Sequence, residues 1–329
     1  MSGMGGFRRI SDLADLPPSL RGGVVAIGNF DGVHRGHLSV LERALGEARA
    51  RGVPALVLTF EPHPRAFFRP DVPLFRLTPP PLKAHILSIL GMDAVVELAF
   101  DQALSQTGAE DFVGRILQDG LGISHVVTGH DFHFGKARQG NPAFLAEAGS
   151  RHGFGVSCVD AFADEGGEIV SSSRIRGLLE EGDVAQAAGL LGYRFTVEAE
   201  ISHGAKLGRT LGFPTANMVL PDTTALKHGI YAVRLRRPDG SLHDGVASFG
   251  RRPTVEEDGA VLLETFMFDF TRDIYGETCT VSFFGFLRHE LKFEGLDPLV
   301  AQMNLDADEA RAVLSGVRPL GEVDLKLGF

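Results

Sequence analysis

The chain has few cysteines, no long apolar run and no excess of positive charge, and each of these absences excludes a class of protein. Its two cysteines, Cys158 and Cys279, lie far apart among 329 residues and form no C-x-x-C pair. No disulfide framework is therefore indicated, and each thiol is expected to fill apolar space in a reducing compartment. A membrane-spanning helix needs a run of about 18 apolar residues, and none occurs. The N-terminal segment also lacks the apolar core of a signal peptide, so the sequence predicts a soluble, cytoplasmic protein.

Acidic residues outnumber basic residues by 42 to 32, and the net charge is −10. This balance argues against a general binder of nucleic acid or of anionic membranes. A site for an anionic small molecule would need local positive charge set into an acidic surface. The length allows two domains, and a hydrophobic fraction of 44% is enough for sizeable cores.

In the first half of the chain, short apolar runs alternate with segments of helical periodicity. One such segment places Leu38, Leu41, Leu45 and Ala48 on one helical face. Strand-then-helix order, with strands that do not alternate in polarity, predicts a doubly wound parallel sheet covered on both faces. Ligands of such sheets bind beyond the carboxyl ends of the strands. The expected strands are 24–29, 54–60, 93–100, 124–129 and 155–162.

After about residue 192 the pattern changes to strand-like segments with no long helix between them. Asp239-Gly240 is a strong signal for a hairpin turn. This half is expected to form an antiparallel sheet or small barrel, closed by a helix over 299–314. The predicted domains are 1–186 and 187–329. The expected strands are 194–202, 229–237, 243–250, 262–270 and 277–286.

A glycine-rich stretch, GNFDGVHRGH at 28–37, follows the first apolar run and leads into a helical segment. Its glycines allow the backbone to approach a ligand closely, and the start of a helix presents N–H groups to an anion. His34 and His37 could donate hydrogen bonds to phosphate oxygens and stabilise a leaving pyrophosphate. The stretch therefore favours a phosphate site. It is not a P-loop, because the chain has no G-x-x-x-x-G-K-[ST] sequence.

Two other interpretations of this stretch stay open. A zinc site needs three or four ligands, and only Asp31 accompanies the two histidines. The stretch could also be a glycine-rich turn with exposed histidines and no ligand. A second segment, VSSSRIRGLLEEGD at 170–183, has serines and arginines where a helix should begin. Serines there cap helices, but with Arg176 they would also clamp a polyphosphate.

Together, GNFDGVHRGH and SSSRIR resemble the nucleotidyltransferase signature of bacterial FMN adenylyltransferases. TFEPHP (59–64) and TGHDFHFG (128–135) fall in the family's order between them. The resemblance implies that His34 and His37 are catalytic, holding the phosphates of ATP and stabilising the transition state without a covalent intermediate. It further implies binding of ATP phosphates by Gly28, Phe30, Asp31, Gly36, Ser172, Ser173 and Arg176, and binding of flavin or nucleotide by Asp131 and Phe132.

The segment GAKLGRTLGFPTANM at 204–218 is either a basic loop between strands or a flap whose backbone and cations meet phosphates. Thr215 and Asn217 are two residues apart, which puts both side chains on one face of an extended segment. Hard oxygen ligands together with phosphate oxygens suit Mg²⁺. Glu264 shares a strand face with Phe266 and Phe268, and its residue pattern is equally compatible with a solvated carboxylate and with a general base.

This half resembles riboflavin kinase through GRTLGFPTAN, GVASFGRRPTV, LETFMFDF, DIYGE and FLRHELKF. The resemblance implies a six-stranded Greek-key β-barrel with a terminal helix. It assigns Mg²⁺ to Thr215 and Asn217, the catalytic base for the ribityl 5′-hydroxyl to Glu264, and a flavin contact to Arg288. The family often has a histidine at the position where this chain has Phe266 or Met267. The ATP-binding residues that it implies are Gly208, Arg209, Gly212 and Pro214.

The order of the two resemblances matches bifunctional riboflavin kinase/FAD synthetases. The expected activity is phosphorylation of riboflavin by ATP to FMN, followed by adenylylation of FMN to FAD with release of pyrophosphate. The expected partners are riboflavin, FMN and ATP, with Mg²⁺ as cofactor and neither nucleic acid nor membrane; weak self-association stays open. Two alternatives are an adenylyltransferase for another small phosphate and a non-catalytic flavin-binding protein on the same scaffold.

Overall fold

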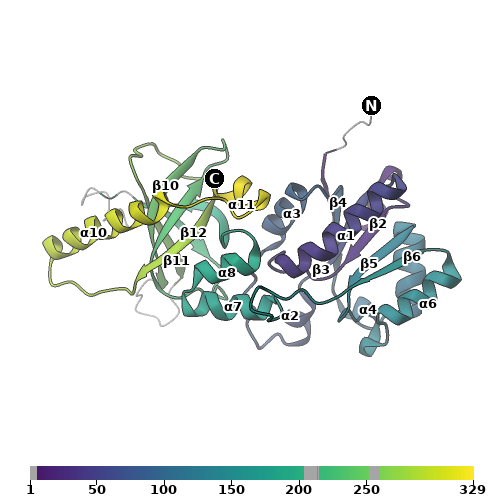
Figure 1. Ribbon diagram of the computed structural model, residues 1–329. Helices are drawn as coiled ribbons and strands as arrows, with labels where there is room; N and C mark the ends of the chain where they lie inside the picture. The colour runs from purple at the N-terminus through teal and green to yellow at the C-terminus, as the bar shows by residue number, and fades with distance from the viewer. Residues whose placement is uncertain (1–5, 204–212, 214, 252–259) are drawn as a thin grey trace. The chain divides into compact units, whose positions relative to one another are not determined.

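The computed structural model describes residues 6–203, 213, 215–251 and 260–329, which form two compact units (Figure 1). The first unit comprises the described residues up to Leu74 together with Thr78–Ser171. The second comprises Phe75–Leu77 and the described part of Ser172–Phe329. The predicted boundary between the two activities, between residues 186 and 187, stays a prediction.

The first unit is built on a six-stranded parallel sheet with strand order β1-β4-β3-β2-β5-β6. The predicted parallel sheet is thereby confirmed, and all five expected strands are present, each within three residues of its predicted ends. The short edge strand β1 was not expected, because three residues show no periodicity. The strands are β1 (Arg8–Ile10), β2 (Val24–Ile27), β3 (Ala55–Glu61), β4 (Ala94–Ala99), β5 (His125–Gly129) and β6 (Gly155–Val159).

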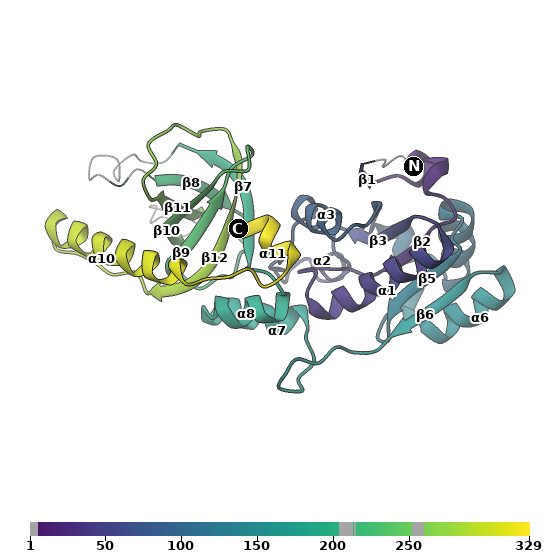
Figure 2. The ribbon, with the colours of Figure 1, turned by 45° about the horizontal axis from the view of Figure 1, so that its top comes forward.

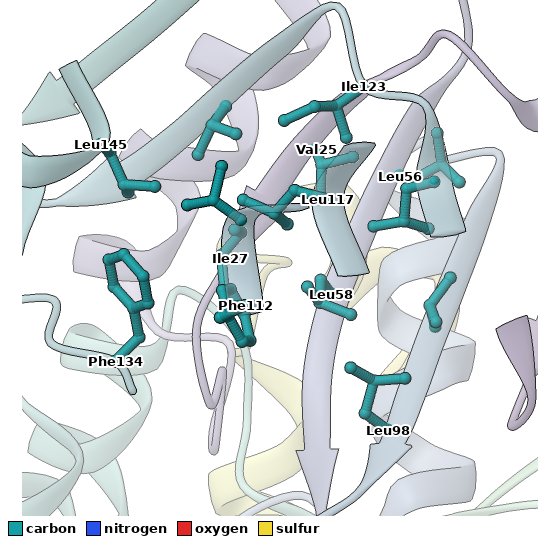
Figure 3. Packing of buried hydrophobic residues seen from close by; sticks show 14 of the residues in the cluster. Val25, Ile27, Leu56, Leu58, Leu98, Phe112, Leu117, Ile123, Phe134 and Leu145 are labelled. Carbon is teal, nitrogen blue, oxygen red and sulfur yellow. The ribbon is translucent and has the colours of Figure 1, made fainter. Parts of the chain in front are cut away.

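Helices cover this sheet, and Figure 3 shows the apolar layer between the strands and one set of them. In this layer Ile27 and Leu58 pack with Phe112 and Leu117, which lie on a π-helical segment between β4 and β5. The helical segments are α1 (Arg35–Arg51), α2 (Pro64–Phe68), α3 (Pro80–Ile89), α4 (Gln102–Ser105), α5 (Ala109–Asp111), η3 (Phe112–Leu121) and α6 (Pro142–His152), with short turns η1 (Leu13–Asp15), η2 (Pro18–Leu20) and η4 (Lys136–Arg138).

The sheet has a topological switch point between β2 and β5, which are neighbours. From β2 the chain adds β3 and β4 on one side, whereas β5 and β6 extend the sheet on the other. The connections that leave these two strands therefore diverge, and a crevice opens at their carboxyl ends. The segment 28–34 leaves β2 and the segment 130–135 leaves β5, so two of the predicted site segments lie at this edge of the sheet.

The second unit is a closed antiparallel barrel of six strands in the order β10-β11-β8-β7-β12-β9. Strand β12 returns to pair with β9 beside the consecutive strands β9, β10 and β11, which is Greek-key order. The predicted barrel is thus confirmed, and Asp239-Gly240 lies in the β9–β10 hairpin as expected. The strands are β7 (Thr196–Ser202), β8 (Thr215–Leu220), β9 (Gly229–Arg236), β10 (Leu242–Arg251), β11 (Val261–Met267) and β12 (Thr278–Arg288).

Helices precede and follow the barrel: α7 (Ser172–Glu181) and α8 (Val184–Leu191) come first, and α10 (Leu296–Ser315) and α11 (Glu322–Gly328) come last. Figure 2 shows α10 lying along the barrel strands and α11 beside the C-terminus. The predicted terminal helix is α10. The seven-residue α11 was not expected, because it is too short for helical periodicity to stand out.

Helix α11 is fastened to the barrel by a buried aspartate and several arginines. Asp324 is 1% exposed and accepts hydrogen bonds from the backbone N–H groups of Arg194 (2.8 Å) and Leu320 (2.9 Å), and from the Arg194 guanidinium. Arg236 donates to the carbonyl oxygens of Leu327 and Phe329. The end of the chain is therefore part of the folded barrel unit.

We expect Asp324→Ala to lower the free energy of unfolding of the barrel unit by about 3 kcal/mol, because it leaves the largely buried guanidinium of Arg194 without its carboxylate partner. All three tyrosines, Tyr193, Tyr231 and Tyr275, lie in this unit and the chain has no tryptophan. Tyrosine fluorescence during urea unfolding of the full chain therefore monitors this unit alone.

The matched control is Glu322→Ala on the same helix, which removes only an exposed ion pair with Lys326. Such pairs contribute less than about 1 kcal/mol, so this variant should unfold close to the wild type. Equal stability of the two variants would show that Asp324 does not hold α11 in place.

Candidate active sites

The segment that leaves β2 has an unusual backbone. Phe30 (φ 47°), Gly32 (φ 91°) and Val33 (φ 37°) all lie in the left-handed region. For residues with a side chain, such a conformation costs on the order of 1–3 kcal/mol and persists only where the surroundings hold it. Here the side chains of Phe30 and Val33 are buried, at 1% and 0% exposure. Apolar burial therefore fixes the strained loop that connects β2 to α1.

Hydrogen bonds to Thr78 also hold this loop in place. The Oδ1 atom of Asp31 accepts a hydrogen bond from the backbone N–H of Thr78 (3.1 Å), and the N–H of Gly32 donates to the Thr78 hydroxyl (2.8 Å). Asp31 is only 2% exposed, so its carboxylate fastens the loop. Its predicted contact with ATP stays a prediction, as does that of Gly28, where an added Cβ would lie 3.1 Å from the Phe30 ring.

His34 and His37 come together at the first turn of α1. His34 is the N-cap residue, and its Nδ1 accepts a hydrogen bond from the backbone N–H of His37 (3.3 Å). The two rings are stacked, with centroids 3.6 Å apart and planes at 17°. At Gly36 an added Cβ would lie 3.2 Å from the His34 ring. The absence of a side chain there lets the two imidazoles pack against the helix start.

The environment of His37 keeps its imidazole uncharged. Burial lowers the pKa of His37 well below its ordinary value, and the nearby His34 and Lys83 lower it further. Its Nδ1 is buried and has no hydrogen-bond partner among the described residues. Because Nδ1 of His34 accepts a hydrogen bond, a neutral His34 carries its proton on Nε2. The uncharged His37 and the Nε2–H of His34 therefore offer N–H donors at a helix N-terminus, where an anion is favoured.

The segment that leaves β5 contributes an exposed carboxylate and an aromatic cluster. Asp131 is exposed, and its carbonyl oxygen lies 2.8 Å from Nδ1 of His133. Phe132 is half-buried and stacks on the buried Phe134, with ring centroids 5.6 Å apart. Both predicted residues thus lie at the carboxyl edge of the sheet, and their contact with flavin or nucleotide stays a prediction.

Helix α7 begins at Ser172 and belongs to the second unit, with Ser173 exposed in its first turn. The Arg176 guanidinium donates through Nε to the carbonyl oxygen of Phe75 (2.6 Å). A helix starts at these serines, as the sequence predicted. The joint binding of one polyphosphate by this helix and the two histidines stays a prediction.

In the barrel, strand register places two of the predicted kinase residues, Asn217 and Glu264, opposite each other. Glu264 on β11 lies directly opposite Asn217 on β8 and Ser248 on β10. Side chains at paired positions point to the same face of a sheet, so Asn217 and Glu264 are cross-strand neighbours. The alternate residues Leu263 and Thr265 are buried at 0% and 1% exposure, whereas Glu264 is half-buried. Residues 47 positions apart in the sequence thus lie side by side on the sheet.

Asn217 has the features of a cation ligand. It is 4% exposed, and its Nδ2 donates to the carbonyl oxygen (3.2 Å) and the hydroxyl (3.4 Å) of Thr215. Its Oδ1 is buried and has no hydrogen-bond partner among the described residues. A buried amide oxygen without a donor, beside a hydroxyl oxygen, suits a hard cation such as Mg²⁺. These two residues therefore fit the metal that the sequence predicts here.

The zinc alternative gains no support from the part of the chain that the structure describes. In it, no three His, Cys, Asp or Glu side chains are arranged so that they could hold a metal ion.

Arg288 is engaged by a carboxylate of α10. Its guanidinium donates to both oxygens of Asp306, at 2.7 Å and 2.5 Å, and Asp306 is 4% exposed. The predicted contact of Arg288 with the flavin stays a prediction. Gly208, Arg209, Gly212 and Pro214, predicted to bind ATP, lie outside the described residues.

One charged residue near the histidines was missed. Lys83 on α3 is completely buried, at 0% exposure, and affects the electrostatics of His37. The sequence contains a signal for it, because the neighbours of Lys83 on the same face of the helix are apolar. These neighbours are Leu82, Ile86 and Leu87, and all three are buried. A lysine in such a pattern is exceptional enough to mark a candidate site residue.

Comparison with known proteins identifies the family of this chain. Residues 16–174 match the FAD synthetase family and residues 191–314 match the riboflavin kinase family. The bifunctional riboflavin kinase/FMN adenylyltransferase of Pseudomonas fluorescens is 42% identical over 304 residues, covering 92% of this chain and 97% of that protein. This chain belongs to the bifunctional riboflavin kinase/FMN adenylyltransferase family. The Escherichia coli K12 member is 36% identical and covers 95% of this chain and 99% of its own length.

A solved structure also resembles this member of the family over nearly its full length. It is titled a macrolide-efflux protein from Streptococcus pneumoniae and is 30% identical, with a TM-score of 0.81, covering 93% of this chain and 98% of that one. Among the residues described for the present chain, no helix is long and apolar enough to cross a membrane. The resemblance stated from the sequence is thus confirmed at the level of family and fold.

The electrostatics of His37 predict that it titrates well below the usual range for histidine. The unfolded chain binds a proton near pH 6.5 and the folded chain does not, so stability falls as the pH drops through and below that value. In proton NMR titrations, the His37 ring signals should stay constant from pH 8 to 6.5. A His37 midpoint at or above 6.5 would contradict the environment described here.

Proposed function

We propose that each of the two predicted domains of this chain houses one of the two reactions of its family. The chain phosphorylates riboflavin with ATP to give FMN, and adenylylates FMN with ATP to give FAD. We assign adenylylation to residues 1–186 and phosphorylation to residues 187–329. The match of residues 191–314 to riboflavin kinase disfavours an adenylyltransferase for some other small phosphate.

The single observation that best supports the adenylylation site is the stacked His34–His37 pair at the start of α1, at the switch point of the sheet. In this reaction a phosphate oxygen of FMN attacks the α-phosphorus of ATP, and the bond to the departing pyrophosphate breaks. Charge then develops on the pyrophosphate oxygens. Imidazole N–H groups and the backbone N–H groups of the helix start would stabilise that charge. No proton transfer to the leaving pyrophosphate is needed.

Replacement of His34 or His37 by Ala should abolish FAD formation and leave FMN formation unchanged. Loss of one donor to a developing charge typically lowers the rate by about 100–1,000-fold. The measurement is chromatography of flavins after mixing the enzyme with FMN and Mg–ATP, or with riboflavin and Mg–ATP. FAD synthesis at the wild-type rate by a folded double variant would remove the histidines from the mechanism.

In the kinase reaction, we assign the base to Glu264 and metal binding to Thr215 and Asn217. Glu264 would accept the proton of the ribityl 5′-hydroxyl as the oxygen attacks the γ-phosphorus. A bound Mg²⁺ neutralises phosphate charge. The pairing of Glu264 with Asn217 in register supports this assignment, because it puts the base beside the metal ligands on a rigid strand pair.

Glu264→Gln keeps the shape of the side chain and removes its basicity. We expect FMN formation at saturating riboflavin to fall by about 100–10,000-fold, the usual contribution of a positioned general base. Adenylylation of added FMN should continue, because that site lies in the other unit. A loss smaller than about tenfold would move the base role to another residue. A chain that binds flavin and forms neither product would instead be a non-catalytic binding protein.

The Mg²⁺ dependence of the residual kinase activity distinguishes the metal-binding role proposed for Asn217 from the base role proposed for Glu264. Glu264→Gln should leave the half-saturating Mg²⁺ concentration of the kinase unchanged, since the metal ligands remain. Asn217→Ala serves as the contrasting variant, because it removes the buried amide oxygen and should raise that concentration. Equal Mg²⁺ dependence in both variants would argue against Asn217 as a ligand.

A further inference from the structure

Lys83 is a fully buried cation with three hydrogen-bond acceptors around it. Its Nζ donates to the carbonyl oxygen of Asn29 (3.0 Å), to Thr59 Oγ1 (3.3 Å) and to Glu61 Oε1 (3.0 Å). Its side chain is 0% exposed, whereas that of Glu61 is 19% exposed. Burying an ammonium group is unfavourable unless it is paired and hydrogen-bonded, and these contacts meet that requirement.

These contacts join three elements at one point of the sheet edge. Asn29 begins the strained segment that leaves β2, Thr59 and Glu61 end β3, and Lys83 lies on α3. The Thr59 hydroxyl also donates to the Asn29 carbonyl oxygen (3.1 Å). The backbone at Asn29 is thereby fixed by two side chains immediately before Phe30, the first residue with a positive φ. The orientation of the loop up to His34 starts from this point.

Stability alone does not account for a lysine at this position. The rest of the buried face of α3 is apolar, and an apolar side chain of similar length would fill the same space. Replacing a buried ion pair by apolar groups is often neutral or stabilising. Direct binding of substrate does not account for it either, because the ammonium group is covered from solvent and directed at protein acceptors. What the ammonium group adds is a fixed attachment of the histidine loop to β3 and α3.

We propose that Lys83 is a positioning residue for adenylyl transfer, whose ammonium group holds the Asn29 carbonyl so that the loop presents His34 and His37 in their reactive geometry. This inference rests on the proposed function of the two histidines. It assigns Lys83 no contact with ATP or FMN. A displacement of about 1 Å caused by a change away from the reacting atoms can lower a rate by about 100-fold.

The test uses the full chain and three variants. Lys83→Met removes the ammonium group and keeps an unbranched side chain. Lys83→Met/Glu61→Gln also removes the carboxylate, so that no buried charge is left alone. His85→Met is the matched control, because it places the same residue on the exposed face of the same helix. FAD formation from FMN gives kcat and the KM for ATP, and FMN formation from riboflavin checks the other unit.

We expect Lys83→Met to lower kcat for FAD formation by about 100-fold while the KM for ATP changes less than about threefold, because positioning acts on the transition state. The double variant should show the same loss, since its Asn29 carbonyl still lacks the ammonium donor and keeps only the Thr59 hydroxyl. If Lys83→Met does not fold, the double variant provides the test. His85→Met and FMN formation should match the wild type. In NMR titrations of the folded variants, the pKa of His37 should move upward, because one nearby positive charge is gone.

Several outcomes would overturn the proposal. Wild-type kcat in folded Lys83→Met would show that the loop needs no such attachment. Recovery of kcat in the double variant would show that the lysine only neutralises Glu61. An unchanged kcat with a raised KM would make Lys83 part of ground-state binding. Failure of the proposed function is distinguishable, because then the wild type and His85→Met would also form no FAD, or His37→Ala would form it normally.

Discussion

The geometry of the proposed adenylyltransferase site depends on a backbone that is held against its own preference. Phe30 and Val33 have left-handed conformations that few residues with side chains adopt, and both are buried. Such a segment relaxes unless its surroundings determine it completely. Here the apolar core, the Asp31–Thr78 contacts and the attachment at Asn29 each restrain a different residue of the loop. Only that combination leaves His34 at the N-cap position, from which its ring can stack on His37.

The barrel unit positions the residues of its proposed kinase site by a different principle. Glu264 and Asn217 lie on paired strands, and their proximity follows from register. A slip of β11 by one residue would turn Glu264 to the other face of the sheet, away from Asn217. Such a slip would also bring Glu264 into the barrel interior in place of Leu263 or Thr265, which are buried. Burial of a carboxylate without a partner is unfavourable, so the packing of the core fixes the register of the site.

What could be predicted from the sequence follows from how far each signal extends along the chain. Strands and long helices repeat their pattern over many residues, and so the parallel sheet, the barrel and α10 were found. Strand β1 and helix α11 are too short to show a period. The structural contact of Asp31 with Thr78 joins residues 47 positions apart, and Lys83 meets its three acceptors only in the folded chain. Side-chain partners of this kind depend on topology and leave no local pattern.

The two units face the same electrostatic difficulty, since a chain with a net charge of −10 must bind polyanions. In the first unit His37 is kept neutral, and the ammonium group of Lys83 is paired with Glu61 inside the protein. Anion binding there would then rest mainly on oriented N–H groups at the start of α1. Fixed dipoles need no rearrangement as charge moves from the α-phosphorus toward pyrophosphate. A cation at His37 would hold the product more strongly, so an uncharged His37 favours release as well as transfer.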